Sequence, residues 1–333
     1  MKKLLASTLL AAGFFGFAGA ASAAGCGSVT IANMNWQSAE ALANLDKLIL
    51  SVGYGCDAEL VAGDTVPTFT SMIEKGQPDI APEGWLNAVK EPLDKAVKEG
   101  KLVYAAPAIT EGGTESWWVP KYFADAHPDI KTIADAMKHP ELFPAPEDPK
   151  KGAVFNCPSG WACQITTGNF FKAYEAEKHG FTLVDTGSAA GLDGSIAKAY
   201  ERKEAWLGYY WGPTAILGKY PMVKLDNGVP WEEKEWKRCN VVADCPDPKP
   251  NGWPKADIYT IVTKKFADAA GPAFEYLKKR QISNEEANKL LAWMVDNQAT
   301  GEDGAKYYLK NNEATWSKWV SPEAAEKIKA AVK

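Results

Sequence analysis

The feature that most constrains the fold is a regular alternation of strand-like and helix-like segments in the N-terminal part of the chain. The strand-like segments are short and β-rich, whereas the helix-like segments repeat apolar residues at helical spacing. We expect these elements at Ser28–Ala32 (strand), Ala39–Ser51 (helix), Asp57–Val61 (strand), Pro67–Lys75 (helix) and Asp79–Ala81 (strand, followed by a turn at Pro82–Gly84). Ser38 is a suitable N-cap for the first helix. The alternation predicts a parallel sheet flanked by helices, which is an α/β fold.

Similar segments continue through the rest of the chain, which ends in a largely helical region. We expect further strands at Leu102–Tyr104, Trp117–Val119, Ala153–Phe155, Ala205–Trp211 and Asp257–Val262. We expect further helices at Ile165–Lys178, Ser195–Lys203, Gly271–Arg280, Ser283–Asn297 (opened by a Ser283–Glu286 capping box), Gly301–Asn311 and Pro322–Val332. The stretch Asp226–Pro254 lacks periodicity, which predicts a long ordered loop. With 333 residues, the chain is long enough for two domains of ordinary size.

The N-terminal stretch has the layout of a secretory signal peptide. Two lysines precede an apolar run, and a small-x-small cleavage site ends at Ala23. The apolar run Leu4–Ala20 is short for a membrane span and lacks a stop-transfer flank. We therefore expect residues 1–23 to be removed and the protein to be exported to the periplasm. The alternative is a lipoprotein modified at Cys26, but the leucine usual before such a cysteine is missing.

All six cysteines follow this cleavage site, and an even number in an oxidising compartment indicates disulfides. Several connectivities are possible, so the pairing rests on proximity in the sequence. Proximity suggests the pairs Cys157–Cys163, Cys239–Cys245 and, by elimination, Cys26–Cys56. The alternative for the two short loops is zinc, but neither contains a histidine or the close cysteine spacing of structural zinc sites. We expect disulfides and no metal.

Charge and missing motifs exclude several classes of function. The formal net charge is -5, and no basic cluster marks a nucleic-acid or anionic surface. The three histidines occupy turn and cap positions and form no metal motif. No nucleophile elbow, phosphate-binding loop or dinucleotide fingerprint is present. No pair of carboxylates stands out among the 42 acidic residues, although such a pair is not excluded. We expect neither catalysis nor a cofactor.

The chain is unusually rich in tryptophan, with 13 residues, and four of them follow or end expected strands. These four are Trp36, Trp85, Trp161 and Trp211, and Trp117, which lies within a strand, is a weaker fifth. In open α/β sheets, ligands bind beyond the carboxyl ends of the strands, so these side chains are expected to converge on one cleft. The alternative is that they are ordinary core or surface residues. This explanation is reasonable for any single tryptophan, but it fits poorly for four at such positions.

Several indoles facing one space favour a particular kind of ligand. The negative faces of the rings attract a cation, each by about 0.5–2 kcal/mol depending on desolvation. A methylated ammonium group suits such a box because it carries charge but has no N–H to hydrogen-bond. The tryptophans therefore predict a small methylated ammonium ligand.

Around these tryptophans the sequence resembles the periplasmic glycine betaine/proline betaine-binding proteins of ATP-driven (ABC) importers and their choline- and trimethylamine N-oxide-binding relatives. The resemblance covers essentially the whole mature chain. The segment Cys157–Cys163 resembles the disulfide loop of the family, which bears one cage tryptophan. Trp85, after Gly76–Ala81, and Trp211, within Tyr209–Pro213, correspond to further cage residues. Trp36 matches the additional N-terminal aromatic of choline-type members.

The resemblance also implies how the other end of the ligand is held. Backbone N–H groups of Ala162 and Cys163 would face the anionic end, near a helix N-terminus that favours negative charge. Two positions depart from the family pattern: Val89 replaces a histidine of betaine binders, and Ser38 replaces an acid of choline binders. Glycine betaine would thus lack one carboxylate partner and choline its polar partner. Glycine betaine and trimethylamine N-oxide rank together, ahead of choline- or carnitine-type ligands.

The resemblance implies a two-lobed, Venus-flytrap binding protein that closes on its ligand. Lobe one is expected to comprise residues 24–113 and 254–333, and lobe two residues 114–253. The protein would act as a monomer that captures an osmolyte and delivers it to an ABC permease in the inner membrane. Two other classes of function stay open: a periplasmic enzyme acting on methylated amines, and a sensory or adhesive module.

Overall fold

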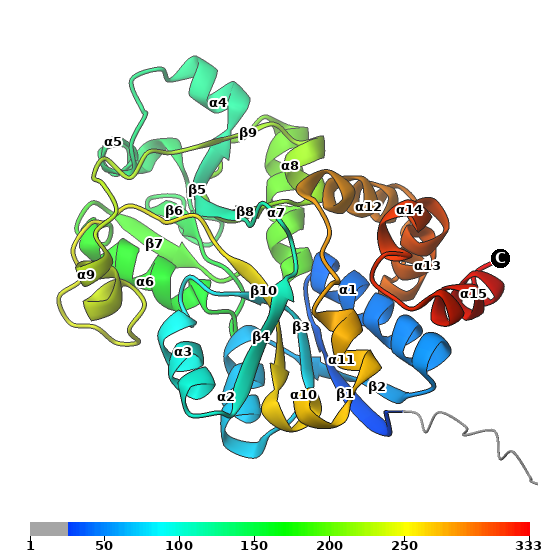
Figure 1. The fold of residues 1–333 in the computed structure, drawn as a ribbon. Coiled ribbons are helices and arrows are strands. Elements are labelled where there is room, and N and C mark those ends of the chain that lie inside the picture. Colours follow the sequence, from blue (N-terminus) through cyan, green and yellow to red (C-terminus); the bar gives the residue numbers. More distant parts are fainter. Residues whose placement is uncertain (1–25) are drawn as a thin grey trace, which may run out of the picture.

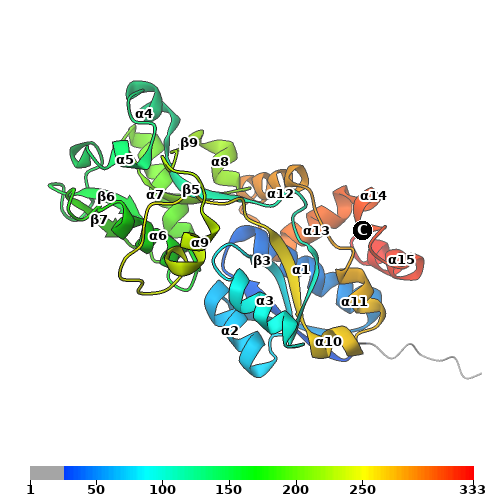
Figure 2. The same cartoon turned by 60° about the vertical axis from the view of Figure 1, so that its left-hand side comes forward.

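A computed structural model describes residues 26–333, so the expected signal peptide and its cleavage site at Ala23 lie outside the described residues. The chain forms two five-stranded sheets flanked by helices (Figure 1). Figure 2 shows the second sheet and its helices on one side, and the first sheet with the C-terminal helices on the other. Between residues 26 and 333, no helix has the length and apolar character needed to cross a membrane.

The first sheet joins strands from both ends of the chain. Its order is β2 (Asp57–Gly63), β1 (Ser28–Met34), β3 (Ile80–Trp85), β10 (Ile258–Thr263) and β4 (Leu102–Pro107). β1 runs parallel to β2 and β3, as expected, but β10 is antiparallel to both β3 and β4. The predicted parallel arrangement of the first three strands is therefore confirmed. The sheet as a whole is mixed, because a strand from a distant part of the chain is inserted between β3 and β4.

Helices cover this sheet and extend it at the C-terminal end. They are α1 (Gln37–Leu48, continued by the π-helix η1, Ile49–Gly53), α2 (Thr65–Lys75), α3 (Lys90–Lys98), α10 (Lys264–Ala269), α11 (Pro272–Leu277), α12 (Asn284–Asp296), α13 (Gly301–Asn311), α14 (Glu313–Trp316) and α15 (Pro322–Ala331). α13 has the bounds predicted from the sequence, and the Ser283–Glu286 capping box is present at α12. Buried residues of α1 and of the C-terminal helices share one hydrophobic core with β1.

The second sheet is also mixed and lies within the middle of the chain. Its order is β7 (Phe181–Val184), β6 (Gly152–Phe155), β8 (Gly208–Gly212), β5 (Thr114–Pro120) and β9 (Met222–Lys224). Its helices are α4 (Lys121–Ala126), α5 (Ile133–Ala136), η2 (Pro140–Leu142), α6 (Cys163–Ala173), α7 (Ala189–Arg202), α8 (Ala215–Lys219), α9 (Glu233–Glu235) and η3 (Trp236–Asn240). The expected loop at Asp226–Pro254 therefore contains the short helices α9 and η3.

Two chain crossings connect the sheets, and they run side by side. Gly113 and Ala256 exchange both backbone hydrogen bonds, with N···O distances of 2.8 and 2.9 Å. Gly112 has a φ of +67°, and a Cβ there would lie 2.3 Å from the Ala256 oxygen, so only glycine fits. The expected lobe boundaries fall at these crossings, and the exact division into lobes stays a prediction.

Two local predictions, for β3 and for the start of α1, are wrong. The turn expected at Pro82–Gly84 is part of β3, where the register with β10 shifts beside Thr260. A bulge of this kind accommodates a proline that has no N–H for the ladder, and the Thr260 hydroxyl donates to the Pro82 oxygen (3.1 Å). Ser38 is not an N-cap, because Trp36 occupies that position and the Ser38 hydroxyl bonds to Glu83 instead.

All three predicted disulfides are present. Cys26 pairs with Cys56, Cys157 with Cys163 and Cys239 with Cys245. The first pair ties the start of β1 to the start of β2, and the second closes the loop between β6 and α6. The predicted pairing by proximity is therefore confirmed.

Candidate ligand-binding site

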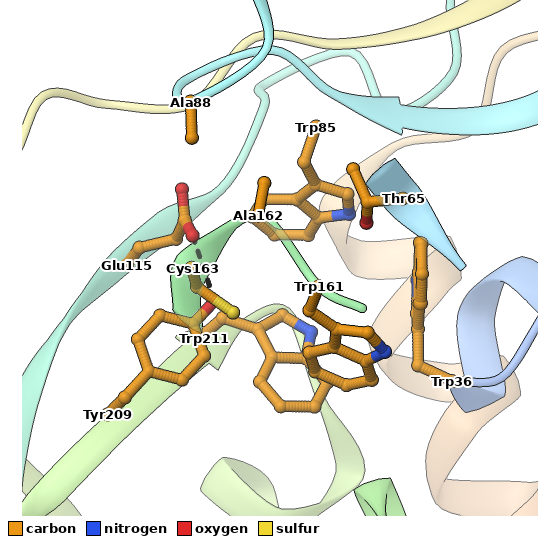
Figure 3. Close-up of a pocket in the computed structure, with 10 residues that line it drawn as sticks. All are labelled: Trp36, Thr65, Trp85, Ala88, Glu115, Trp161, Ala162, Cys163, Tyr209 and Trp211. Atoms are coloured by element: carbon orange, nitrogen blue, oxygen red, sulfur yellow. Dashed lines mark hydrogen bonds between the residues drawn. The ribbon is translucent and has the colours of Figure 1, made fainter. Parts of the chain in front are cut away.

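One cavity lies where the two halves of the chain meet, and all four strand-end tryptophans line it (Figure 3). The first half is the first sheet with its helices, and the second half is the second sheet with its helices. The walls of the cavity are formed by Trp36, Thr65, Trp85, Ala88, Glu115, Trp161, Ala162, Cys163, Tyr209 and Trp211. The first four residues belong to elements around the first sheet, and the other six to elements of the second. The sequence prediction thus placed six lining residues at one site. Trp117, the weaker fifth aromatic, is fully buried beside Tyr174 and does not line the cavity.

Each of the four tryptophans lies at the end of a strand or in the segment that follows one. Trp36 follows β1 and caps α1, and Trp85 is the last residue of β3. Trp161 lies between β6 and α6, and Trp211 is the penultimate residue of β8. Strand ends of two sheets therefore face one another across the cavity, which is the usual position of ligand sites in α/β folds.

Trp161 stands at the centre of the aromatic cluster. Its ring centroid lies 5.3 Å from that of Trp36 and 5.0 Å from that of Trp211, with interplanar angles of 74° and 82°. These are edge-to-face contacts, which hold neighbouring rings in a defined orientation. All three side chains are at most 6% exposed. The indole faces are therefore held in a defined arrangement in this structure.

The indole N–H groups have specific acceptors that fix ring rotation. Trp36 Nε1 and Trp85 Nε1 both donate to Oε1 of Glu83, at 2.7 and 2.8 Å. Trp161 Nε1 donates to Oδ1 of Asn35 at 2.6 Å, which links the second half of the chain to the first. Because a buried indole N–H is costly when unpaired, these bonds leave the rings one preferred orientation each.

The disulfide loop presents Trp161 together with a helix terminus. The Cys157–Cys163 bond closes the loop, and Ala162 is the N-cap of α6. The first turn of a helix leaves its N–H groups without intrahelical partners, and the helix dipole adds partial positive charge there. Ala162 and Cys163 line the cavity. This wall can therefore accept an anionic or strongly hydrogen-bonding ligand atom.

The same loop contacts the first half of the chain directly. The Val66 N–H, in the first turn of α2, donates to the Gly160 oxygen at 3.0 Å. Gly160 has a φ of +90°, and a Cβ at this position would lie 3.0–3.1 Å from side-chain atoms of Asp64. Glycine therefore permits both the turn and the close approach to α2.

Sequence analysis missed the polar wall of the cavity. Glu115 of β5 is 7% exposed, and its Oε1 accepts from the Tyr209 hydroxyl at 2.8 Å. Its Oε2 accepts from Asn87 Nδ2 at 2.7 Å. Burial raises the pKa of the Glu115 carboxyl, and the bonds from Tyr209 and Asn87 oppose that rise. No local signal marked Glu115, because its burial depends on β8, where it pairs opposite Trp211.

The charge of the lining is distinctive. Among its ten residues, none is a lysine, arginine or histidine, and the ionisable side chains are Glu115 and Tyr209. Burial raises the pKa of Tyr209 well above its ordinary value, so its hydroxyl remains a donor. Within residues 26–333, no group of three or more histidine, cysteine, aspartate or glutamate side chains is arranged to hold a metal. The cavity is thus an aromatic box with one buried acid and one helix N-terminus.

The fold has known relatives. The protein family described as the substrate binding domain of ABC-type glycine betaine transport systems matches residues 27–311. The glycine betaine/L-proline-binding protein ProX of Borrelia burgdorferi is 19% identical, with a TM-score of 0.71 over 90% of this chain and 99% of that chain. Lactococcal OpuAC, solved in a closed form with glycine betaine, is 20% identical, with a TM-score of 0.67 over 88% and 99% of the two chains.

A choline-binding protein of an ABC transporter, solved in complex with choline, is 16% identical, with a TM-score of 0.71 over 92% of this chain and 99% of that chain. At these identities the likeness shows a shared fold and not a shared ligand. The two five-stranded sheets with their helices match the architecture of these two-lobed binding proteins. The predicted fold class is therefore confirmed.

Proposed function

This chain belongs to the family of substrate-binding domains of ABC-type glycine betaine transport systems, and we propose that its four-tryptophan cavity captures a small methylated ammonium osmolyte. Proteins of this family are the substrate-binding components of transporters rather than enzymes, and they work with a membrane permease. They act outside the cytoplasmic membrane, which agrees with the signal peptide expected from the sequence.

The observation that carries the proposal is the set of four fixed indoles around one cavity. Trp36, Trp85, Trp161 and Trp211 come from four separate elements, and no cationic side chain competes for their faces among the lining residues. Each face attracts a desolvated cation by about 0.5–2 kcal/mol. A quaternary or fully substituted nitrogen gains this attraction without leaving an N–H unpaired in an apolar box.

The polar wall bears on which osmolyte binds. A carboxylate ligand would meet the buried Glu115 and only the N-terminus of α6 as a positive counterpart. The single oxygen of trimethylamine N-oxide needs fewer donors, and Glu115 in its protonated form can supply one. We therefore place trimethylamine N-oxide first and glycine betaine second. Choline is a further candidate, because an ionised Glu115 would accept a hydrogen bond from its hydroxyl group.

We further propose that the two halves of the chain act as lobes that close on the ligand. Trp36 and Trp85 lie on the first half and Trp161 and Trp211 on the second, so a cation between them contacts both. Closure is favoured only by contacts that the open form lacks. The bonds from Trp161 to Asn35 and from Asn87 to Glu115 span the halves and would form on closure. We propose that a monomer carries out this cycle.

The test is isothermal titration calorimetry with trimethylamine N-oxide, glycine betaine, choline, carnitine and proline. The proposal expects one of the first two to bind tightest and to be recovered chemically unchanged. Binding no tighter than millimolar for every ligand would refute the aromatic box. Turnover of a bound methylated amine would instead support the alternative of an enzyme.

A further inference from the structure

Glu83 lies behind the cavity and does not line it, yet it contacts two of the four cage tryptophans. Its Oε1 accepts hydrogen bonds from Trp36 Nε1 (2.7 Å), Trp85 Nε1 (2.8 Å) and the Ser38 hydroxyl (2.9 Å). The side chain is completely buried. Glu83 and Trp85 are two residues apart in β3, so both point to the same face of that strand. One carboxylate oxygen thus fixes the edge of Trp85, at the end of β3, and the edge of Trp36, which follows β1.

Among residues 26–333, the Glu83 carboxyl has no direct ion-pair partner. Arg280 is the buried cation nearby, but its ion pair is with Asp46, where Nε and Nη2 donate to the two carboxylate oxygens at 3.0 Å. Arg280 Nη2 also donates to the backbone oxygen of Pro82, next to Glu83 (2.8 Å). Burial raises the pKa of Glu83, whereas the three donors and the nearby Arg280 favour its ionised form.

A carboxylate at the edge of an indole affects what the face of that indole can bind. The N–H edge of the ring carries partial positive charge, and the faces carry partial negative charge. An anion bonded to the edge polarises the ring further in this sense and also attracts a cation directly across the ring. Trp161 donates its N–H to the amide oxygen of Asn35, and this indole also opposes the burial-driven rise in the pKa of the nearby Asp64 carboxyl. Glu83 exerts this effect on Trp36 and Trp85, the two indoles that are bonded to it.

We propose that Glu83 is a positioning and specificity residue of the cage: a buried counter-charge, held behind Trp36 and Trp85, that favours a ligand with a cationic ammonium group over one with a neutral carbon in its place. This role rests on the proposed function of the cavity. The carboxylate touches no ligand atom and acts through the two indoles. The indole faces already favour a trimethylated nitrogen over a trimethylated carbon. The negative charge behind two of the rings strengthens that preference.

The test compares each ammonium ligand with its carbon analogue in wild type and Glu83→Gln. The pairs are trimethylamine N-oxide with tert-butanol, and glycine betaine with 3,3-dimethylbutanoate. The amide oxygen of glutamine can still accept from both indoles, and Glu83 Oε2 has no hydrogen-bond partner among residues 26–333, so the substitution mainly removes charge. We expect affinity for the ammonium ligand to fall about tenfold or more, and affinity for the carbon analogue to change less than about threefold.

Ser38→Ala is the matched control, because it removes one donor to Oε1 but keeps the charge and both indole bonds. It should preserve the preference for the ammonium ligand. If Glu83→Gln weakens both members of a pair equally, Glu83 is only structural and this inference is refuted while the proposed function stands. If wild type itself shows no preference for the ammonium ligand, the proposed function and this inference fail together.

A measurement on the wild type covers the case in which Glu83→Gln does not fold. The carboxyl 13C resonance of Glu83, assigned in labelled protein, reports its ionisation state near neutral pH. An ionised carboxyl, together with strongly downfield indole protons for Trp36 and Trp85, is the expected result. A protonated Glu83 in the folded protein at neutral pH would refute the counter-charge.

Discussion

Replacing Trp161 by alanine is the perturbation that bears most heavily on the aromatic box. The ligand loses one indole face, worth about 0.5–2 kcal/mol. Trp161 also contacts Trp36 and Trp211 edge-to-face, at centroid distances of 5.3 and 5.0 Å. Each such contact is worth about 0.5–1.5 kcal/mol, so both neighbours lose part of what orients them. We expect the Kd for the tightest ligand to rise tenfold or more, which is about 1.4 kcal/mol or greater.

The assay is calorimetry on purified wild type and variant, with thermal melting to verify that the variant is folded. Trp231→Ala is the matched control, because Trp231 is 45% exposed and does not line the cavity. It should bind the ligand as the wild type does. A folded Trp161→Ala protein whose affinity stays within about twofold of wild type would refute the reasoning and return Trp161 to a packing role.

Three further perturbations test separate parts of the molecule. Because burial raises the pKa of Glu115, the neutral form of its carboxyl gains population as the pH falls. Trimethylamine N-oxide should therefore bind more tightly at mildly acidic than at alkaline pH, as measured by calorimetry. Glu115→Gln should remove this pH dependence, and a wild-type affinity that does not change with pH would contradict the donor role of Glu115. Replacing Cys157 and Cys163 by serine should lower the free energy of unfolding in urea by about 2 kcal/mol, and an unchanged value would argue against a clamp. Arg280→Met leaves the buried Asp46 without its ion-pair partner and with only the Tyr276 hydroxyl as a side-chain donor, and it should lower the free energy of unfolding by about 3–5 kcal/mol in the same assay. Adding Asp46→Leu should restore much of this loss, and no recovery would contradict the pairing.

The parts of the fold that sequence predicted well are those set by local pattern. β1 begins at the expected Ser28, and α13 spans the expected Gly301–Asn311, because each has its own periodicity and boundary residues. The end of β3 was missed because a strand through Pro82 is possible only beside the bulge with β10, whose residues are distant in sequence. For the same reason, sequence did not show that the first sheet is mixed.

Some residues of the candidate site could likewise be predicted from local sequence, and others could not. The four tryptophans were found because strand ends can be recognised locally and because indoles in loops are unusual. Glu83 and Glu115 were missed, since a buried acid becomes evident only when its donors, Trp36 and Tyr209 among them, arrive from other strands. Trp117 was included as a weaker fifth aromatic within a strand, but it is fully buried beside Tyr174. Polar partners therefore required the structure, whereas the four cage tryptophans did not.

The most direct test of the central claim is a crystal structure of the protein with trimethylamine N-oxide or glycine betaine. The methylated nitrogen should lie within about 6 Å of the ring centroids of Trp36, Trp85, Trp161 and Trp211, with its oxygen facing Glu115 or the first turn of α6. A ligand bound outside this cavity, or bound with its nitrogen away from the indole faces, would contradict the claim.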